Sequence, residues 1–248
     1  MPSRVESVET PEGSFDLTVW LPESGTGPGL LLIQEIFGVG DYIQAVAGDL
    51  AGLGYVVAAP DLFWRLKHGH SARHDESGMA ESFDLASRFD MEKGVDDATI
   101  ALRHLIGLPE VDGGVGIIGF CLGGSIAYLV AARAEVDAAA AELAAVVSFY
   151  GSIVPDNLDV LGQVRSPVQF HFGGSDPYIP REQVAKVEAA AAGRPDVEVH
   201  VEEDAGHAFH NRMAPLFHAA EPAARAWRRT EEFLQRHLPA REKTSSSS

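Results

Sequence analysis

Short apolar runs alternate with helix-like patterns along most of the chain. The run at residues 15–21 alternates apolar and polar side chains, which is the pattern of a strand with one exposed face. Later runs are continuously apolar, and such runs are typical of strands that helices cover on both faces of a parallel sheet. These later runs are GLLLIQE, YVVAAPDL, VGIIGF, AVVSFYG, PVQFHFGG and VEVHVEED.

Helix-like segments separate the apolar runs, and the repeated strand–helix order predicts an α/β fold. We expect a mostly parallel central sheet with helices on both faces. The helical segments cover residues 41–53, 80–106, 122–134, 181–192 and 219–237. Neither a shift in composition nor a long linker divides the chain, so we expect a single domain over residues 1–238.

Two segments fall outside this alternation. Residues 62–79 are polar and lack a clear period, which predicts a cap or active-site loop over one end of the sheet. Three histidines there, His68, His70 and His74, raise the question of a metal site. They share a loop without cysteine or a fixed geometry, so we interpret them as solvated histidines and expect no metal. Residues 239–248 have the composition of a disordered tail.

The overall composition narrows the class of partner. Hydrophobic residues make up 46% and charged residues 22% of the chain, as in a globular protein with a sizeable core. A net charge of -17 makes nucleic acid and anionic membranes poor partners, because both bind basic surfaces. The N-terminal residues lack the apolar core of a signal peptide, so we expect a cytoplasmic protein. We further expect a monomer or weak homodimer that acts on a small molecule and needs no cofactor.

Candidate chemistry centres on residues 113–132, GGVGIIGFCLGGSIAYLVAA, which carry no charge and include the only cysteine. The stretch is long enough for a membrane helix, and Gly119 and Gly123 have GxxxG spacing. However, six glycines within residues 113–124 would weaken any helix there. The flanking strand–helix units are also those of a soluble α/β protein, so we reject a membrane span.

A nucleotide-binding loop is the second interpretation, since Gly114, Gly116 and Gly119 satisfy GxGxxG. That fingerprint needs its glycines between a strand and a helix, with an acidic residue about twenty positions later. Here the glycines lie within the apolar run that predicts the strand, and Glu142, near that distance, lies in an alanine-rich helical run. We therefore interpret the match as accidental.

The third interpretation is a turn that presents a nucleophile. Residues 119–123, GFCLG, follow an apolar strand and precede the helical SIAYLVAA, which is the form of a nucleophile elbow. The turn would place Cys121 at a helix N-terminus, where backbone N–H groups and the helix dipole favour negative charge. The alternative is a buried core cysteine beside a glycine turn.

A nucleophile elbow predicts an acid and then a histidine, each after a later strand. Asp176 follows the run PVQFHFGG and His207 follows VEVHVEED, so the order Cys121, Asp176, His207 is that of the α/β-hydrolase fold. His207 would take the thiol proton, and Asp176 would orient the imidazole. Taken singly, Asp176 could equally stabilise a turn, and His207 could be a surface histidine.

An oxyanion hole would complete such a site. We expect it to come from the N–H of Leu122, after the nucleophile, and the N–H of Ile36, in the loop after GLLLIQE. Glu35 ends that apolar run. Because burying a charge without a partner is costly, a carboxylate at this place indicates a functional role.

Six motifs together resemble those of the dienelactone hydrolases (carboxymethylenebutenolidases). The resemblance extends over about residues 5–236, and its motifs are QEIFG, APDL, FDMEKGVDD, GFCLGG, GGSDPYIP and AGHAF. It implies an α/β-hydrolase fold and a cysteine hydrolase that opens an enol-lactone to a dicarboxylic acid. It also implies that Glu35 interacts with the thiol of Cys121 and keeps it neutral until substrate binding shifts the carboxylate.

The resemblance also implies pocket residues. Phe37 and Tyr150 match aromatic pocket positions of the family. Family members that act on dienelactone hold the substrate carboxylate with two arginines, and Met79 and Asn211 stand at those positions here. Arg212, one step further along, is therefore our candidate for substrate binding.

Hydrolysis of a lactone or ester bond in a small, dienelactone-like substrate is the leading hypothesis. It would proceed through a Cys121–His207–Asp176 triad and a cysteinyl acyl-enzyme. A general small carboxylesterase or thioesterase with the same triad is the alternative among enzymes. A non-catalytic protein that binds a small molecule is the alternative from another class.

Overall fold

The computed structural model describes residues 2–240, and within this range eight strands form one sheet in the order β1-β2-β4-β3-β5-β6-β7-β8. The strands are β1 (Ser3–Thr10), β2 (Gly13–Trp20), β3 (Gly27–Ile33), β4 (Val56–Pro60), β5 (Val111–Phe120), β6 (Leu143–Phe149), β7 (Val168–Gly173) and β8 (Val197–Glu202). The α-helices are α1 (Asp41–Gly52), α2 (Trp64–Lys67), α3 (Glu76–Ser87), α4 (Met91–Ile106), α5 (Leu122–Ala131), α6 (Ala138–Ala141), α7 (Arg181–Ala191) and α8 (Ala220–His237). Two short 3-10 helices, η1 (Val154–Asp156) and η2 (Leu158–Gln163), precede β7.

The sheet is mostly parallel, as the apolar runs predict. Strand β2 pairs antiparallel with β1 and β4, whereas every neighbouring pair from β4 to β8 is parallel. All residues of β3, β4 and β7 are buried, while β2 alternates buried and partly exposed positions. Continuous apolar runs therefore mark the central strands, and an alternating apolar and polar pattern marks a strand near the edge.

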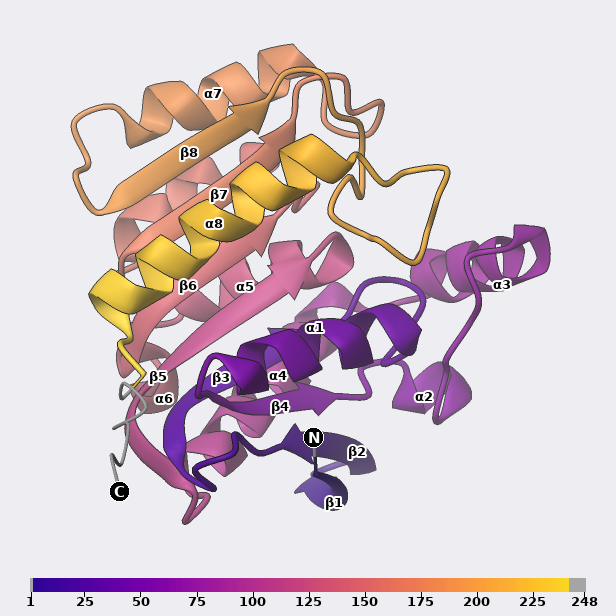
Figure 1. Cartoon of the computed structure of the whole chain (residues 1–248), viewed down its shortest axis with the longest axis vertical. Coiled ribbons are helices and arrows are strands. Elements are labelled where there is room, and N and C mark those ends of the chain that lie inside the picture. Colours follow the sequence, from indigo (N-terminus) through magenta and orange to yellow (C-terminus); the bar gives the residue numbers. More distant parts are fainter. Residues whose placement is uncertain (1, 241–248) are drawn as a thin grey trace, which may run out of the picture.

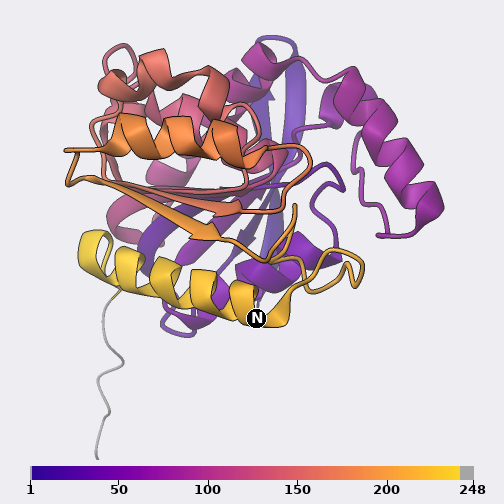
Figure 2. The ribbon, with the colours of Figure 1, turned by 90° about the horizontal axis from the view of Figure 1, so that it is seen from above.

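Helices cover both faces of the sheet (Figures 1 and 2). Helices α1 and α8 lie on one face, and α4, α5 and α7 lie on the other. Helices α2 and α3 and the loop between β8 and α8 gather beyond the carboxyl ends of the parallel strands (Figure 1). Loops from several strands meet at that end, so it is the edge where side chains distant in the sequence come together.

The chain differs from the predicted elements near its N-terminus. The hydrophobic pattern does not predict β1, because most of its side chains are polar and Val8 is its one buried residue. Register with β2, from Ser3 opposite Trp20 to Thr10 opposite Gly13, holds the strand at the edge of the sheet. Backbone pairing of this kind leaves no periodic signal in an exposed edge strand.

The segment predicted as one helix over 80–106 is two helices, α3 and α4. Asp90 ends the connection between them, and its side chain accepts the N–H of Lys93 at 3.2 Å, which caps the first turn of α4. Helix α3 begins earlier than predicted because Asp75 accepts the N–H of Gly78 at 2.9 Å. The predicted loop over 62–79 is therefore partly helical, with α2 and the first turn of α3 inside it. Most of the predicted tail, residues 241–248, lies outside the described residues.

Candidate active site

Cys121 occupies a strained turn between β5 and α5, where the sequence predicts a nucleophile elbow. Its φ of 55° and ψ of -116° lie outside the ordinary regions for a residue with a side chain. The turn requires small neighbours. A Cβ on Gly119 would lie 2.0 Å from the carbonyl oxygen of Gly123, and a Cβ on Gly123 would lie 2.3 Å from that of Ile33. The glycines of G-x-C-x-G thus allow the end of β5 to lie close to the start of α5, and the start of α5 to lie close to the end of β3.

The structure brings together the three residues predicted to act with the thiol. Asp176 follows β7 and His207 follows β8, at the edge of the sheet where β5 also ends. Cys121 Sγ lies 3.1 Å from His207 Nε2, and His207 Nδ1 lies 2.7 Å from Asp176 Oδ2. The other carboxylate oxygen of Asp176 accepts the N–H groups of Tyr178 at 2.8 Å and Ile179 at 3.3 Å, which fixes its orientation.

The surroundings of His207 favour the charged imidazole. Burial lowers the pKa of His207, but the charge interaction with the sulfur of Cys121 and the hydrogen bond with Asp176 outweigh this effect. Together they raise the pKa of His207 to about 10. An imidazolium between the carboxylate of Asp176 and the sulfur of Cys121 can stabilise a thiolate and can later protonate a leaving group.

Other histidines near this edge do not share that environment. His210 is buried, and burial lowers its pKa to about 3, so it is neutral; its Nδ1 lies 2.7 Å from the hydroxyl of Tyr42. Burial also places the pKa of His171 well below its ordinary value, and Gln169 and Thr230 are its partners. These two histidines belong to the packing of the sheet.

The predicted oxyanion-hole residues follow Cys121 in one case and β3 in the other. Leu122 is the first residue of α5, where a backbone N–H has no acceptor inside the helix. Ile36 follows β3 and lines the same cavity as Cys121 and His207. The close approach of Gly123 to the carbonyl groups of Ile33 and Gln34 sets the distance between the two loops that carry these N–H groups.

Glu35 is buried at 2% exposure, and its partners are two residues that the sequence did not assign to it. His74 Nε2 lies 2.8 Å from Glu35 Oε1, and Asn211 Nδ2 lies 3.0 and 3.1 Å from the two carboxylate oxygens. The interpretation of His70 and His74 as solvated histidines is therefore wrong. His70 is buried and lies 3.2 Å from the hydroxyl of Ser82, and the side chain of His74 is 7% exposed. His68 alone of the three is exposed.

A cavity of about 190 Å³ opens beside the thiol, and apolar side chains dominate its wall. Helix α3 contributes Met79, Phe83 and Ala86 to it. The whole lining is Glu35, Ile36, Phe37, Met79, Phe83, Ala86, Cys121, Ser152, Tyr178, His207, Ala208, Asn211 and Phe217. Lysine and arginine are absent from this described lining, so the cavity offers a bound carboxylate no permanently charged partner.

Two residues predicted for substrate binding lie elsewhere. Arg212 is not among the residues that line the cavity and forms a surface ion pair with Asp49 at 2.6 Å, so its binding of substrate stays a prediction without support from this arrangement. Tyr150 is fully buried beneath the site, and its ring lies 5.1 Å from that of His207. It supports the imidazole and is not part of the cavity lining, whereas Phe37 is.

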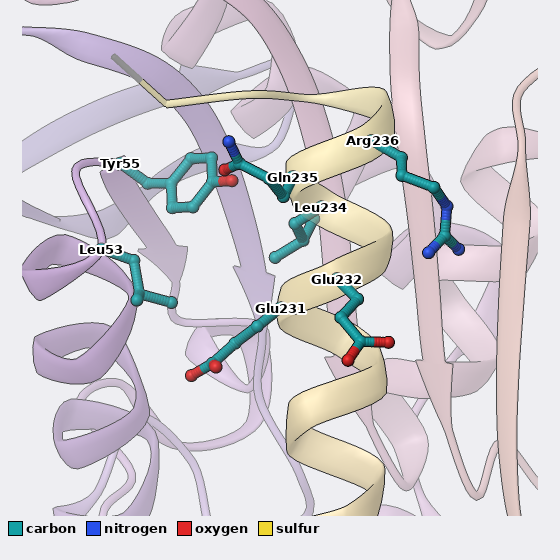
Figure 3. A pocket seen from close by; sticks show the side chains of 7 residues that line it. All are labelled: Leu53, Tyr55, Glu231, Glu232, Leu234, Gln235 and Arg236. Carbon is teal, nitrogen blue, oxygen red and sulfur yellow. The ribbon is translucent and has the colours of Figure 1, made fainter. Parts of the chain in front are cut away.

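A larger hollow of about 520 Å³ lies between the start of β4 and the end of α8 (Figure 3). Its wall includes Tyr55, Glu231, Glu232 and Arg236; in Figure 3 Glu231 extends from α8 toward the side of Leu53, and Arg236 extends from the other side of the helix. It shares no residue with the cavity at Cys121, so the candidate chemistry belongs to the smaller cavity.

Residues 2–240 contain neither a cluster of metal ligands nor a membrane-spanning helix. No group of three or more His, Cys, Asp or Glu side chains in this range is arranged to hold a metal ion. No helix of the range is long and apolar enough to cross a bilayer. The stretch at 113–132 is instead the end of β5, the turn at Cys121 and α5.

The mostly parallel sheet and the sharp turn after β5 define an α/β hydrolase, and that turn carries Cys121. The family model of the dienelactone hydrolases matches residues 15–238, and the chain belongs to this family. It is accordingly a hydrolase of ester or lactone bonds. A carboxymethylenebutenolidase of Pseudomonas putida is 34% identical over 230 residues, which cover 92% of this chain and 94% of the relative.

Solved structures show the same fold. A dienelactone hydrolase-like promiscuous phosphotriesterase from metagenomic libraries superposes with a TM-score of 0.78 at 23% identity, covering 96% of this chain and 98% of its own. A dienelactone hydrolase from Anabaena variabilis superposes with a TM-score of 0.69 at 20% identity, with coverage of 96% and 98%. At these identities the likeness concerns the fold alone.

Proposed function

We propose that the chain hydrolyses an ester or lactone bond of a small substrate through the thiol of Cys121, with a covalent acyl-cysteine intermediate. The hydrogen-bonded series from Asp176 through His207 to Cys121, at the wall of an apolar cavity, is the observation that carries this proposal. Thiol, base and orienting acid are the parts that nucleophilic catalysis requires, and they stand at the distances it requires.

Acylation uses the thiolate as nucleophile. Sγ of Cys121 attacks the carbonyl carbon, and the N–H groups of Ile36 and Leu122 stabilise the oxyanion that forms. The C–O bond then breaks, and Nε2 of His207 gives its proton to the leaving oxygen. In a lactone the leaving oxygen stays attached to the acyl group, so the ring opens on the enzyme.

Deacylation reverses the roles with water. Neutral His207 takes a proton from a water molecule, whose oxygen attacks the thioester carbonyl. The C–S bond breaks, Cys121 leaves as the thiolate, and the carboxylic acid product departs. Asp176 stabilises the imidazolium in both halves of the reaction.

Rapid mixing with an activated aryl ester of a short acid, followed by an acid quench, tests the intermediate. We expect intact-mass spectrometry to show one added acyl group, because thioesters survive acid, and peptide mapping to place it on Cys121. Cys121→Ala should remain unmodified under the same conditions. An acyl group on another residue of the active protein would contradict the proposal.

The lining of the cavity favours an uncharged substrate over one that carries a carboxylate. Relatives are named for carboxymethylenebutenolide, which bears a carboxylate, and a buried carboxylate needs charge-assisted hydrogen bonds to offset its desolvation. At the two positions where the family resemblance expects arginines, this chain has Met79, on α3, and Asn211. The amide of Asn211 already donates to Glu35. A neutral ester or lactone with an apolar group therefore fits this wall better.

Comparing kcat/KM for a neutral aryl ester and a dienelactone measures this preference. We expect the ratio to favour the ester by roughly 10-fold or more, which is about the worth of one charge-assisted hydrogen bond. Met79→Arg should move the ratio towards the dienelactone, because it adds a cation to the cavity wall. Val136→Arg, which adds the same charge at an exposed site, is the matched control and should not move it. A wild-type protein that strongly prefers the dienelactone would exclude an uncharged substrate class.

A further inference from the structure

The cap segment at residues 68–75 is fixed to the loop that follows β3. Gly38 and Ser71 form an antiparallel bridge, and the N–H of Ala72 donates to the carbonyl oxygen of Phe37 at 3.0 Å. The ring of His74 lies 4.2 Å from that of Phe37. This contact brings the imidazole of His74 from the cap into the active site, beside the buried carboxylate of Glu35.

The carboxylate of Glu35 is held by side chains from two loops. His74 Nε2 lies 2.8 Å from Oε1 and 2.8 Å from Nδ2 of Asn211, and that amide nitrogen lies 3.0 and 3.1 Å from the two carboxylate oxygens. The orientation of that amide is fixed, because its oxygen accepts the N–H of Met213 at 2.9 Å and leaves the NH2 group facing Glu35. A carboxylate with these partners is satisfied without the thiol.

The thiol, in turn, has His207 as its hydrogen-bond partner at 3.1 Å. We propose that His74 is a positioning residue that holds Glu35 away from Cys121, so that the thiol proton passes to His207 Nε2 before any substrate binds. This inference rests on the proposed function. It differs from the expectation drawn from the family resemblance, in which Glu35 binds the thiol and keeps it neutral until substrate arrives.

The remaining ionisable groups around the two sites do not change this assignment. Asp176 faces His207 on the side opposite the thiol, and Tyr178 packs its ring 5.0 Å from the imidazole. Tyr42 and Tyr150 lie beneath the site, and burial raises the pKa of both well above the ordinary value, so both are neutral. The side chains that decide the state of the thiol are therefore Glu35, His74, His207 and Asp176.

Loss of the His74 imidazole would leave the buried carboxylate of Glu35 short of one polar partner. The nearest way to restore it is a hydrogen bond from a protonated thiol, which removes the nucleophile, or uptake of a proton by the carboxylate itself. His74→Phe keeps a ring against Phe37 and removes the donor. His74→Gln keeps a neutral donor, and His68→Gln changes an exposed histidine of the same segment and serves as the control.

Alkylation of the free protein by iodoacetamide, without substrate and from pH 5 to 9, tests the proposal. An ordinary thiol is well under about 1% thiolate at pH 6, so its alkylation there is slow. We expect fast alkylation of the wild type at pH 6, a rate at least about 10-fold lower for His74→Phe, partial recovery for His74→Gln and no change for His68→Gln. Thiolate absorbance in the ultraviolet should follow the same order.

Two results would overturn the proposal. One is wild-type alkylation with the pH profile of an ordinary thiol, and the other is a folded His74→Phe variant that reacts like wild type. Circular dichroism and thermal unfolding establish that the variants are folded. If the ester is hydrolysed with an acyl group on Cys121 while the free thiol reacts slowly, the positioning role fails and the proposed function stands. If Cys121→Ala retains hydrolysis, the proposed function itself fails.

Discussion

Replacing Cys121 with alanine is expected to lower kcat/KM for every ester or lactone substrate by roughly 10⁴-fold or more. In the proposed mechanism the substitution removes the nucleophile and leaves the cavity, His207 and the N–H groups proposed as the oxyanion hole, whose residual contribution is small on that scale. Stability should change little, because Cys121 is partly exposed and loses one atom. Steady-state kinetics beside thermal unfolding of the same samples separates the two effects.

Cys121→Ser is the sharper version of this experiment. Serine fits the elbow, but its hydroxyl keeps its proton far more strongly than a thiol, and the site surrounds the sulfur with groups suited to a thiolate. We expect activity at least about 100-fold below wild type, with substrate binding intact. Near-full esterase activity in Cys121→Ser would show that the reaction does not need a thiolate, even if Cys121→Ala is inactive.

Gly123→Ala is expected to destabilise the fold by roughly 3 kcal/mol, or to prevent folding. The added methyl would lie 2.3 Å from the carbonyl oxygen of Ile33 and 2.5 Å from that of Gln34, and both belong to backbone that cannot rotate away. Any relaxation must push α5 from the end of β3, which separates the N–H groups of Ile36 and Leu122. Urea unfolding should show the loss, and any folded fraction should hydrolyse ester more slowly.

Gly48→Ala is the matched control for that substitution. Gly48 lies inside α1, and a Cβ there would meet no other atom within 4 Å. Alanine has the higher helix propensity, so this variant should gain about 0.5–1 kcal/mol in the free energy of unfolding. Equal destabilisation by both substitutions would mean that the contact with β3 is not the cause.

The central strands and the three residues that follow them could be predicted from the sequence for one physical reason. Fully buried strands appear as continuous apolar runs, and parallel strands bring their carboxyl ends to one edge. The positions of Cys121, Asp176 and His207 after such runs therefore predict their meeting. Strand β1 could not be predicted from an apolar run, because it lies at the edge of the sheet and is mostly polar.

The partners of Glu35 could not be predicted, because no local pattern encodes them. His74 and Asn211 are 39 and 176 positions from Glu35, and a hydrogen bond over such a separation leaves no periodic trace. The placement of Arg212 could not be predicted either, although it is adjacent to Asn211 in the sequence. One step along the loop separates Asn211, which is buried against Glu35, from Arg212, which pairs with Asp49 on the surface.

Helix α3 has a consequence for how this protein can change in evolution. Its residues Met79, Phe83 and Ala86 line the cavity at a spacing that puts them on one helical face, and the helix projects from the body in Figure 2. The groups proposed to react, Cys121, Asp176 and His207, lie in loops at the sheet edge. A few substitutions on α3 can therefore change which substrates fit the cavity without moving these groups. Substrate specificity and the catalytic groups can therefore evolve separately, and related proteins with the same cysteine can differ in the substrates they accept.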